Sequence, residues 1–336
     1  MRPIRTKGFL LAVAVAATAV VAATPAGAAP AAQPAGGTSS SPAALWDPVH
    51  GASTARSDAD ARRIIDAYWT PERTASARSA DVAPVAARGA ARTATTTAQP
   101  EVTGARPAAP TAAAAASMDA WFSNATGKVF FRNASNGGNF VCTASAINSG
   151  SKRLVLTAGH CVHGGRGGTW HQNWVFVPGY TNGNRPLGTF PATSLRTFDA
   201  WITSSEYTRD VGFVVTGNNA GGSTLVSVAG GHGIAFNAGT AVPVHVAGYP
   251  LDRAGGEAQQ YCIGTTRAWS PAVPGSQIDC GFGSGASGGP WLRDYQSTGL
   301  GTAVSETMGI SGATANYGPP FDNAVRDLFN TVKDAS

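Results

Sequence analysis

The sequence predicts an all-β fold for its C-terminal two thirds, and three observations support this prediction. Short runs rich in β-branched and aromatic residues recur between glycine and asparagine turns from residue 118 onward. The same region contains all four cysteines and 35 of the 42 glycines, as expected for a loop-rich domain with disulfides. Many short strands at this spacing are typical of a β-barrel or a β-sandwich.

Eight runs are the predicted strands. They cover Lys128–Arg132, Phe140–Ala144, Arg153–Thr157, Trp174–Val177, Val211–Thr216, Thr224–Val228, Ala241–Ala247 and Gly301–Ser305. The chain ends differently, because apolar residues after Pro319-Pro320 repeat at intervals of three and four, which predicts an amphipathic helix packed on the β domain. The repeating positions are Phe321, Ala324, Val325, Leu328 and Val332.

The distribution of charge argues against a nucleic-acid partner. The 336 residues carry a formal net charge of +5. Residues 1–117 hold 11 basic and 7 acidic side chains, whereas residues 118–336 hold 13 and 12. The excess positive charge therefore lies outside the predicted β domain and does not indicate a surface for nucleic acid or for anionic membranes.

The first 28 residues have the three parts of a secretory signal peptide. Arg2, Arg5 and Lys7 precede an apolar stretch from Phe9 to Ala23, and small residues ending at Ala28 follow. The apolar stretch is shorter than the ~20 residues of a membrane-spanning helix. We expect cleavage after Ala28 and a secreted, extracellular protein without membrane attachment; an uncleaved anchor is the alternative.

Residues 29–117 are predicted to form a mostly disordered pro-segment. They include 29 alanines and 9 prolines, too little apolar surface to offset the entropy of ordering. One short helix is predicted at Ser57–Trp69, because Ser57 and Asp60 form a capping box and apolar residues follow on one face. That face needs a partner surface, which favours a propeptide docked on the domain of residues 118–336. An inert spacer is the alternative.

Four cysteines in an exported protein indicate two disulfides. Three pairings are possible, and closure between cysteines that are near in the sequence favours Cys142–Cys161 and Cys262–Cys280. Each bond would stabilise the fold by about 3 kcal/mol in the chain-entropy description. A zinc site is disfavoured, because the chain has no C-x-x-C pair. We expect neither a metal nor an organic cofactor.

One histidine and one serine lie in segments suited to nucleophilic catalysis. His160 follows an apolar strand in Leu-Thr-Ala-Gly-His-Cys. Ser287 lies in Gly-Ala-Ser-Gly-Gly-Pro, where the backbone can turn sharply and present amides to an oxyanion. An α/β-hydrolase would place its histidine after the serine. The last histidine here is His245, so that interpretation fails.

The remaining chain order is histidine, acid, serine. Asp210 is the favoured acid, because it leads directly into the apolar strand Val211–Thr216, which would bury a carboxylate beside the imidazole. Asp199, which precedes Ala-Trp-Ile, is the alternative.

These three segments resemble the active-site blocks of the chymotrypsin-like (trypsin-like) serine peptidases, and the secreted bacterial branch related to the glutamyl endopeptidases is the most similar. The similarity covers about residues 127–332. It implies a double six-stranded β-barrel of chymotrypsin type with a C-terminal helix and an active site between the barrels. It also implies that His160 is the general base, Asp210 its orienting partner and Ser287 the nucleophile, with the amides of Gly285 and Ser287 as the oxyanion hole.

Several positions depart from the patterns of that family. Ala286 stands where animal members have an acid that pairs with the new N-terminus, so activation through a terminal ion pair is not expected. Gly281 stands where trypsin-like members have an aspartate. Phe282 and Val304 stand where glutamate-specific members have a hydroxyl residue and a histidine. The sequence therefore supports a preference neither for a basic nor for an acidic substrate side chain before the cleaved bond.

Four residues are candidates for the substrate pocket: Phe282, Ser305, Glu306 and Thr307. The resemblance suggests that Ser305 and Thr307 make backbone contacts with an extended substrate. Glu306 could accept a basic side chain, and a place on an exposed rim is the alternative.

The sequence as a whole predicts a secreted, monomeric serine endopeptidase made as a zymogen. Its expected partners are a protein or peptide substrate and its own pro-segment. A non-catalytic peptide-binding protein on a peptidase fold and an esterase with the same triad are the alternatives.

Overall fold

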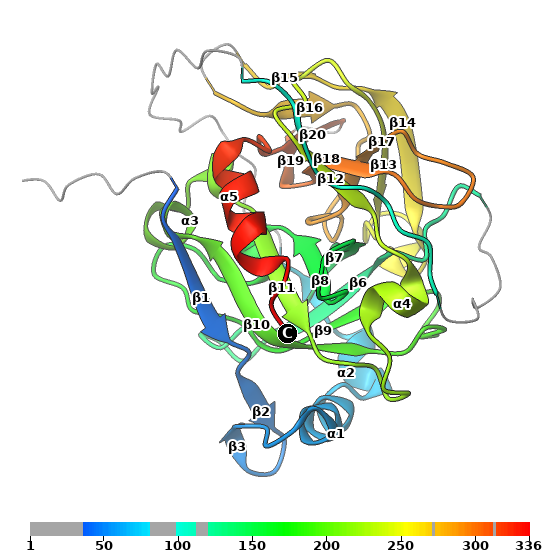
Figure 1. Ribbon diagram of the computed structural model, residues 1–336. Helices are drawn as coiled ribbons and strands as arrows, with labels where there is room; N and C mark the ends of the chain where they lie inside the picture. Colours follow the sequence, from blue (N-terminus) through cyan, green and yellow to red (C-terminus); the bar gives the residue numbers. More distant parts are fainter. Residues whose placement is uncertain (1–35, 81–98, 112–119, 271–272, 312–313) are drawn as a thin grey trace, which may run out of the picture. The chain divides into compact units, whose positions relative to one another are not determined.

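The computed structural model describes residues 36–80, 99–111, 120–270, 273–311 and 314–336 (Figure 1). The predicted signal peptide lies outside these residues. Within them, none of the helices has the length and apolar character needed to cross a membrane.

Six antiparallel strands form a closed barrel in the order β9-β6-β7-β8-β11-β10, and β10 pairs back onto β9. The strands are β6 (Thr126–Arg132), β7 (Asn139–Ile147), β8 (Leu154–Thr157), β9 (Gln172–Pro178), β10 (Phe190–Phe198) and β11 (Gly212–Thr216). Val129, Phe131, Phe176 and Leu195 are among the side chains that fill the barrel. Five of the eight predicted strands lie in this barrel.

The second half of the β domain consists of two sheets. The first sheet has the order β14-β13-β17-β18-β12-β5, and the second has the order β15-β16-β20-β19. Their strands are β5 (Val102–Ala105), β12 (Gly233–Phe236), β13 (Pro243–Gly248), β14 (Gln260–Thr265), β15 (Arg267–Ala268), β16 (Ser276–Ile278), β17 (Pro290–Arg293), β18 (Thr302–Glu306), β19 (Gly309–Ser311) and β20 (Ala315–Gly318). Only Thr266 separates β14 from β15, so the chain passes directly from one sheet to the other.

The predicted C-terminal helix is α5 (Asn323–Val332). The Asp322 carboxylate caps it by accepting the backbone N–H groups of Ala324 and Val325 at 3.0 and 3.2 Å. Its buried Phe329 ring packs against Phe213 of β11 and Phe236 of β12. Because those strands belong to different halves, α5 fixes one half of the domain against the other (Figure 1).

One predicted strand is wrong. The run at 224–228 forms a short helix, α4 (Leu225–Ala229), although its residues favour strands. Leu225, Val226 and Ala229 all point into the core of the first barrel. Helical spacing places these three side chains on one face, so packing overrides the local preference. The other short helices are α3 (Asp199–Ser204), η1 (Gly159–Cys161), η2 (Tyr207–Arg209) and η3 (Ala254–Gly256).

The alanine- and proline-rich region holds more regular structure than its composition predicts. The predicted helix is present as α1 (Asp58–Tyr68), and the Ser57 hydroxyl accepts the N–H of Asp60 at 3.2 Å. Its buried Ile64 and Ile65 pack with Phe130 of the barrel. The region also contains β1 (Thr38–Pro42), β2 (Leu45–Asp47), β3 (Gly51–Ser53), α2 (Pro71–Ala75) and β4 (Arg78–Ser79).

Most of these extra strands obtain their hydrogen-bonding partners from the β domain. Strand β1 lies along β10, as Figure 1 shows, β4 pairs with β7, and β5 pairs with β12. The composition of a segment indicates only how much apolar surface it can bury by itself. It does not indicate whether a strand elsewhere in the chain offers the segment an unpaired edge to bind. The expectation of a mostly disordered segment is therefore corrected for residues 36–80 and 99–111.

Candidate active site

His160 and Asp210 form a buried pair. The N–H of His160 donates to Asp210 Oδ1 at 2.7 Å, and His160 Nδ1 lies 2.8 Å from Asp210 Oδ2. Both side chains are buried. A carboxylate can only accept, so Nδ1 carries the proton and Nε2 is left with the lone pair that a general base needs.

The sheet register places these two residues together. His160 lies in η1, directly after β8, and Asp210 lies directly before β11. Strands β8 and β11 are neighbours, with Thr157 opposite Gly212. Gly159 is required at this approach, because a Cβ there would meet Asp210 Oδ1 at 2.9 Å.

Asp199, the alternative acid, lies elsewhere. It begins α3, and its Oδ1 accepts the hydroxyl of Ser39 in β1 at 2.6 Å. The geometry therefore favours Asp210 as the partner of His160.

The loop that contains Ser287 is fixed to strand β7. The N–H of Thr143 donates to the carbonyl oxygen of Ser287 at 2.8 Å, and the Thr143 hydroxyl donates to that of Gly285 at 2.9 Å. Gly288 has φ +83°, and a Cβ on it would collide with the carbonyl oxygen of Thr143 and the hydroxyl of Thr157. Only glycine allows the Ser287 loop to lie this close to the barrel.

Both predicted disulfide pairings are present, Cys142–Cys161 and Cys262–Cys280. The first joins β7 to the residue after His160, with Cα atoms 6.2 Å apart. Cys142, Cys161 and His160 could in principle hold a metal ion. Because the two sulfur atoms are bonded to each other, they are not thiolate ligands, and the cluster is not a suitable metal site.

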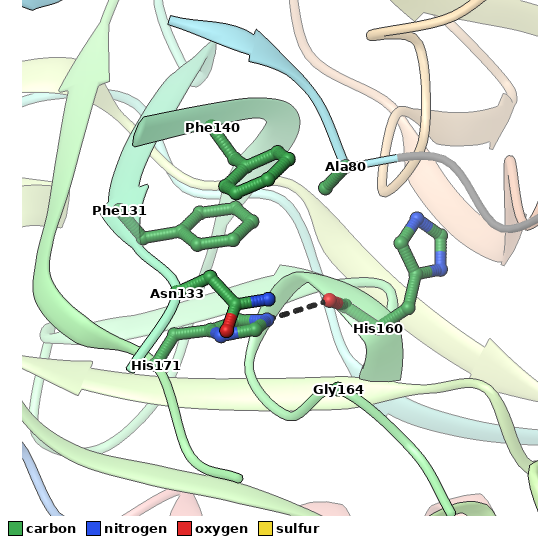
Figure 2. A pocket seen from close by; sticks show the side chains of 7 residues that line it. All are labelled: Ala80, Phe131, Asn133, Phe140, His160, Gly164 and His171. Atoms are coloured by element: carbon green, nitrogen blue, oxygen red, sulfur yellow. Dashed lines mark hydrogen bonds between the residues drawn. The ribbon is translucent and has the colours of Figure 1, made fainter. Parts of the chain in front are cut away.

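His171 supports the His160 turn, a role that no motif in the sequence indicates. Its Nε2–H donates to the carbonyl oxygen of His160 at 3.0 Å (Figure 2). The ring stacks on Phe131 with centroids 4.3 Å apart. Burial lowers the pKa of His171 to about 3, so the ring is neutral. Both rings line a cavity of about 120 Å³ together with His160, Phe140 and Ala80.

The four candidate pocket residues are all buried, so none lines an open pocket in this structure. Phe282 packs in the apolar core of the second half. The guanidinium carbon of Arg253 lies over its ring, 4.8 Å from the ring centroid. The Ser305 hydroxyl donates to the carbonyl of Pro319. Both backbone groups of Thr307 are used within the domain, by Gly288 N–H and the Gly289 carbonyl.

Glu306 is the clearest correction among these residues. A rim position or a contact with a basic substrate requires exposure, whereas Glu306 is 0% exposed. Its Oε2 accepts the N–H of Gly288, the residue after Ser287, at 3.1 Å. Burial and the neighbouring charge of Asp210 raise the pKa of Glu306 well above its usual range.

Three solved structures are similar to the chain. The thermostable serine protease AL20 from an extremophilic microorganism has 31% identity and a TM-score of 0.59, over 64% of this chain and 99% of that one. Protease Anisep from Arthrobacter nicotinovorans has 29% identity and a TM-score of 0.58, over 68% and 100%. A Glu endopeptidase has 19% identity and a TM-score of 0.52, over 69% and 99%. No protein-family model and no curated protein matches.

A closed β-barrel, a second β half and a C-terminal helix, with a buried histidine–aspartate pair, define a chymotrypsin-type fold. The chain belongs to the chymotrypsin-like serine peptidases, and its fold relates it to the glutamyl endopeptidases. It is a serine endopeptidase.

Proposed function

We propose that the protein hydrolyses peptide bonds through a triad of His160, Asp210 and Ser287. The observation that supports this most directly is the double hydrogen bond between His160 and the buried Asp210 carboxylate, which orients the imidazole. The loop of Ser287 is fixed to the same strand, β7, that the disulfide joins to the His160 turn.

In the first step Ser287 Oγ attacks the carbonyl carbon of the scissile bond, and its proton passes to His160 Nε2. The amides of Gly285 and Ser287 are proposed to stabilise the oxyanion. Collapse breaks the C–N bond, and His160 gives the proton to the leaving amine. Water then attacks the acyl ester and gives a proton to His160, which returns it to Ser287 Oγ as the acid product leaves.

Labelling with a fluorophosphonate tests this assignment. The protein freed of its pro-segment should react at Ser287, and Ser287→Ala should remain unlabelled. A binding protein on the same fold would give no label. Parallel assays with casein and a simple acyl ester separate a peptidase from an esterase, since an esterase would turn over only the ester. The three-residue assignment is overturned if Ser287→Ala keeps its activity.

The pro-segment is proposed to keep the enzyme latent, and residues 36–80 lie where they could do so. Strand β4 runs parallel to Phe140 and Val141 at the edge of β7, and the Ala80 N–H donates to the carbonyl of Val141 at 3.3 Å. Ala80 and His160 line the same cavity (Figure 2). A substrate could not occupy this edge of β7 at the same time.

Helix α1 anchors this strand. The Tyr68 hydroxyl donates to Asn139 Oδ1 at 2.7 Å, and Trp69 Nε1 donates to the carbonyl of Asn173 at 2.8 Å. Activation would then consist of removing the segment that contains α1 and β4. Two disulfides are typical of proteins in an oxidising, extracellular environment, and secretion through residues 1–28 is part of this proposal.

Residues 99–111 are proposed to remain with the mature enzyme, in contrast to the boundary expected at residue 117. Strand β5 extends the sheet of the second half by pairing with β12, and Ala108 exchanges two backbone hydrogen bonds with Gly231. Glu101 also accepts two hydrogen bonds from Arg293, at 2.7 and 2.8 Å. N-terminal sequencing of the secreted enzyme should therefore find a start after Ala80 and no later than Gln99.

A further inference from the structure

Glu306 is a buried carboxyl group for which the proposed mechanism has no use. It lies at the end of β18, opposite Pro290 of β17 in the sheet register. Its side chain is completely buried, and among the described residues no lysine or arginine pairs with it. A buried carboxylate without a cation is costly, so a buried carboxyl at this place needs an explanation.

The hydrogen bonding of Glu306 fits a neutral carboxyl group. Oε2 accepts the N–H of Gly288 at 3.1 Å, and the same N–H also donates to the carbonyl oxygen of Thr307 at 2.7 Å. Oε1 is buried and has no partner among the described residues. An ionised group would leave one charged oxygen unsatisfied. A protonated group uses Oε2 as its carbonyl oxygen, so that only a neutral hydroxyl at Oε1 lies without a partner, which costs less than an unpaired charge.

The electrostatic surroundings point the same way. The titratable group that acts on Glu306 is Asp210, whose two oxygens are already bound by His160. From β17 Glu306 meets Pro290, and from the Ser287 loop it meets the Gly288 amide. Strand β12, the other neighbour of β18, has no charged residue, so none of these elements supplies a charge. Burial and a neighbouring negative charge both disfavour the ionised form of Glu306.

We propose that Glu306 is a positioning residue that works as a neutral acid: together with the Thr307 carbonyl it holds the Gly288 amide beside the proposed nucleophile, and it keeps a second negative charge away from Asp210. This proposal rests on the proposed triad of His160, Asp210 and Ser287. An ionised Glu306 would place a second negative charge next to Asp210 and would disturb the charge balance on which the imidazole depends.

Carboxyl NMR tests the protonation state directly. The chain has five glutamates, so labelling glutamate at Cδ gives five carboxyl signals, and Glu306→Gln identifies the signal of Glu306. The measurement uses the full chain with Ser287→Ala, which prevents self-cleavage. The Glu306 signal should stay at its neutral position at pH values where the other four have ionised. Titration together with the other glutamates would overturn the proposal.

The partnership with Asp210 has its own test. In Asp210→Asn, the neighbouring charge is absent, so Glu306 should ionise at lower pH than in the unchanged chain. An unchanged midpoint would overturn the pairing. The matched control is Glu257→Gln, because Glu257 pairs with Lys128 at 2.8 Å and does not contact the triad. It should leave the Glu306 midpoint unchanged.

Activity provides the third readout. Glu306→Leu, which leaves the Gly288 amide to the Thr307 carbonyl alone, should lower kcat about tenfold or more, as expected for a lost positioning contact. Glu306→Gln keeps an acceptor for that amide without a titratable proton, so it should restore part of kcat. In the unchanged chain kcat should fall as the pH rises through the range in which Glu306 ionises, and in Glu306→Gln this fall should be absent. The proposal would be overturned if both variants lost the same amount of kcat and if their kcat depended on alkaline pH in the same way as in the unchanged chain. An active Ser287→Ala would instead contradict the proposed triad, whatever Glu306 does.

Discussion

Thr143 donates its backbone N–H to the carbonyl oxygen of Ser287 at 2.8 Å. The preceding residue, Cys142, is bonded to Cys161, which directly follows His160. Two adjacent residues of one strand therefore hold the histidine turn and the serine loop. Strand β7 acts as the common support that sets the relative position of the proposed base and nucleophile, and damage to it should reduce turnover as well as stability.

The two disulfides allow a matched test of this role. They span 19 and 18 residues, so their removal should destabilise the fold by comparable amounts, about 3 kcal/mol each. Replacing Cys142 and Cys161 by serine should also lower kcat, because the His160 turn loses its support. The corresponding double variant at Cys262 and Cys280 should retain more of kcat. Steady-state kinetics at a temperature where both variants remain folded measures the difference, and equal kcat values would contradict it.

Removal of triad groups should abolish turnover while the fold persists. Ser287→Ala and His160→Ala should each lose several orders of magnitude in kcat, because the three groups act as a unit. Asp210→Asn should be severely impaired, since an amide can stabilise the wrong tautomer of His160. Asp199→Asn is the control, because Asp199 binds Ser39 instead. An inactive Asp199→Asn beside an active Asp210→Asn would show that the acid is misassigned.

The parts of the fold that the sequence predicts correctly are those that depend on patterns within short stretches of the chain. Five strands of the first barrel, helix α1 and helix α5 follow from patterns within short windows. The failures involve distant partners: α4 is helical because of the barrel core, and β1, β4 and β5 exist because other strands offer them an edge. Such tertiary determinants do not appear in local composition.

In the candidate site, too, local sequence patterns identify some residues, whereas others depend on tertiary packing. The motifs around His160, Asp210 and Ser287 mark residues whose local chemistry is unusual, and the structure brings His160 and Asp210 into contact. The role of His171 and the burial of Glu306 depend on what packs around them. A glutamate between serine and threonine suggests a solvated position, and only the packing of β18 under the Ser287 loop reverses that expectation.

Loosening the docked pro-segment should activate the uncleaved chain. Ile65→Ala removes a completely buried side chain from the face of α1 that packs on the barrel, which should cost about 2–5 kcal/mol of docking and folding stability. The full-length variant should therefore hydrolyse a peptide substrate faster than the unchanged full chain. Ala67→Ser, on the exposed face of the same helix, serves as the control. If both chains were equally active before cleavage, residues 36–80 would not be inhibitory.

Stability should fall as the pH falls below about 6.5, partly because of His232. Burial lowers its pKa to about 3, whereas the unfolded residue has a pKa of about 6.5. Between these values the unfolded state binds more protons, so the free energy of unfolding falls by up to about 1.4 kcal/mol per pH unit. His232→Asn should be less stable at pH 7 but should have a shallower slope between pH 6 and 4. Urea unfolding at several pH values provides the measurement, and an unchanged slope would mean that His232 is charged in the fold.

Glu306 should affect stability with the opposite sign, and this is measurable without any assay of activity. Its pKa is raised in the folded protein, so above the ordinary glutamate pKa the unfolded state releases a proton that the folded state keeps. The unfolded state then binds fewer protons, and the free energy of unfolding falls as the pH rises through this range.

Glutamine has nearly the same shape as a protonated glutamate but cannot ionise on unfolding. Glu306→Gln should therefore be more stable than the unchanged chain at pH 8, and the difference should shrink towards pH 4, where glutamate is mostly protonated in both states. Urea unfolding in the Ser287→Ala background, where self-cleavage is prevented, compares the two chains. A difference that does not change between pH 4 and pH 8 would mean that Glu306 has the same charge in the folded and unfolded states, contrary to a neutral acid beneath the nucleophile loop.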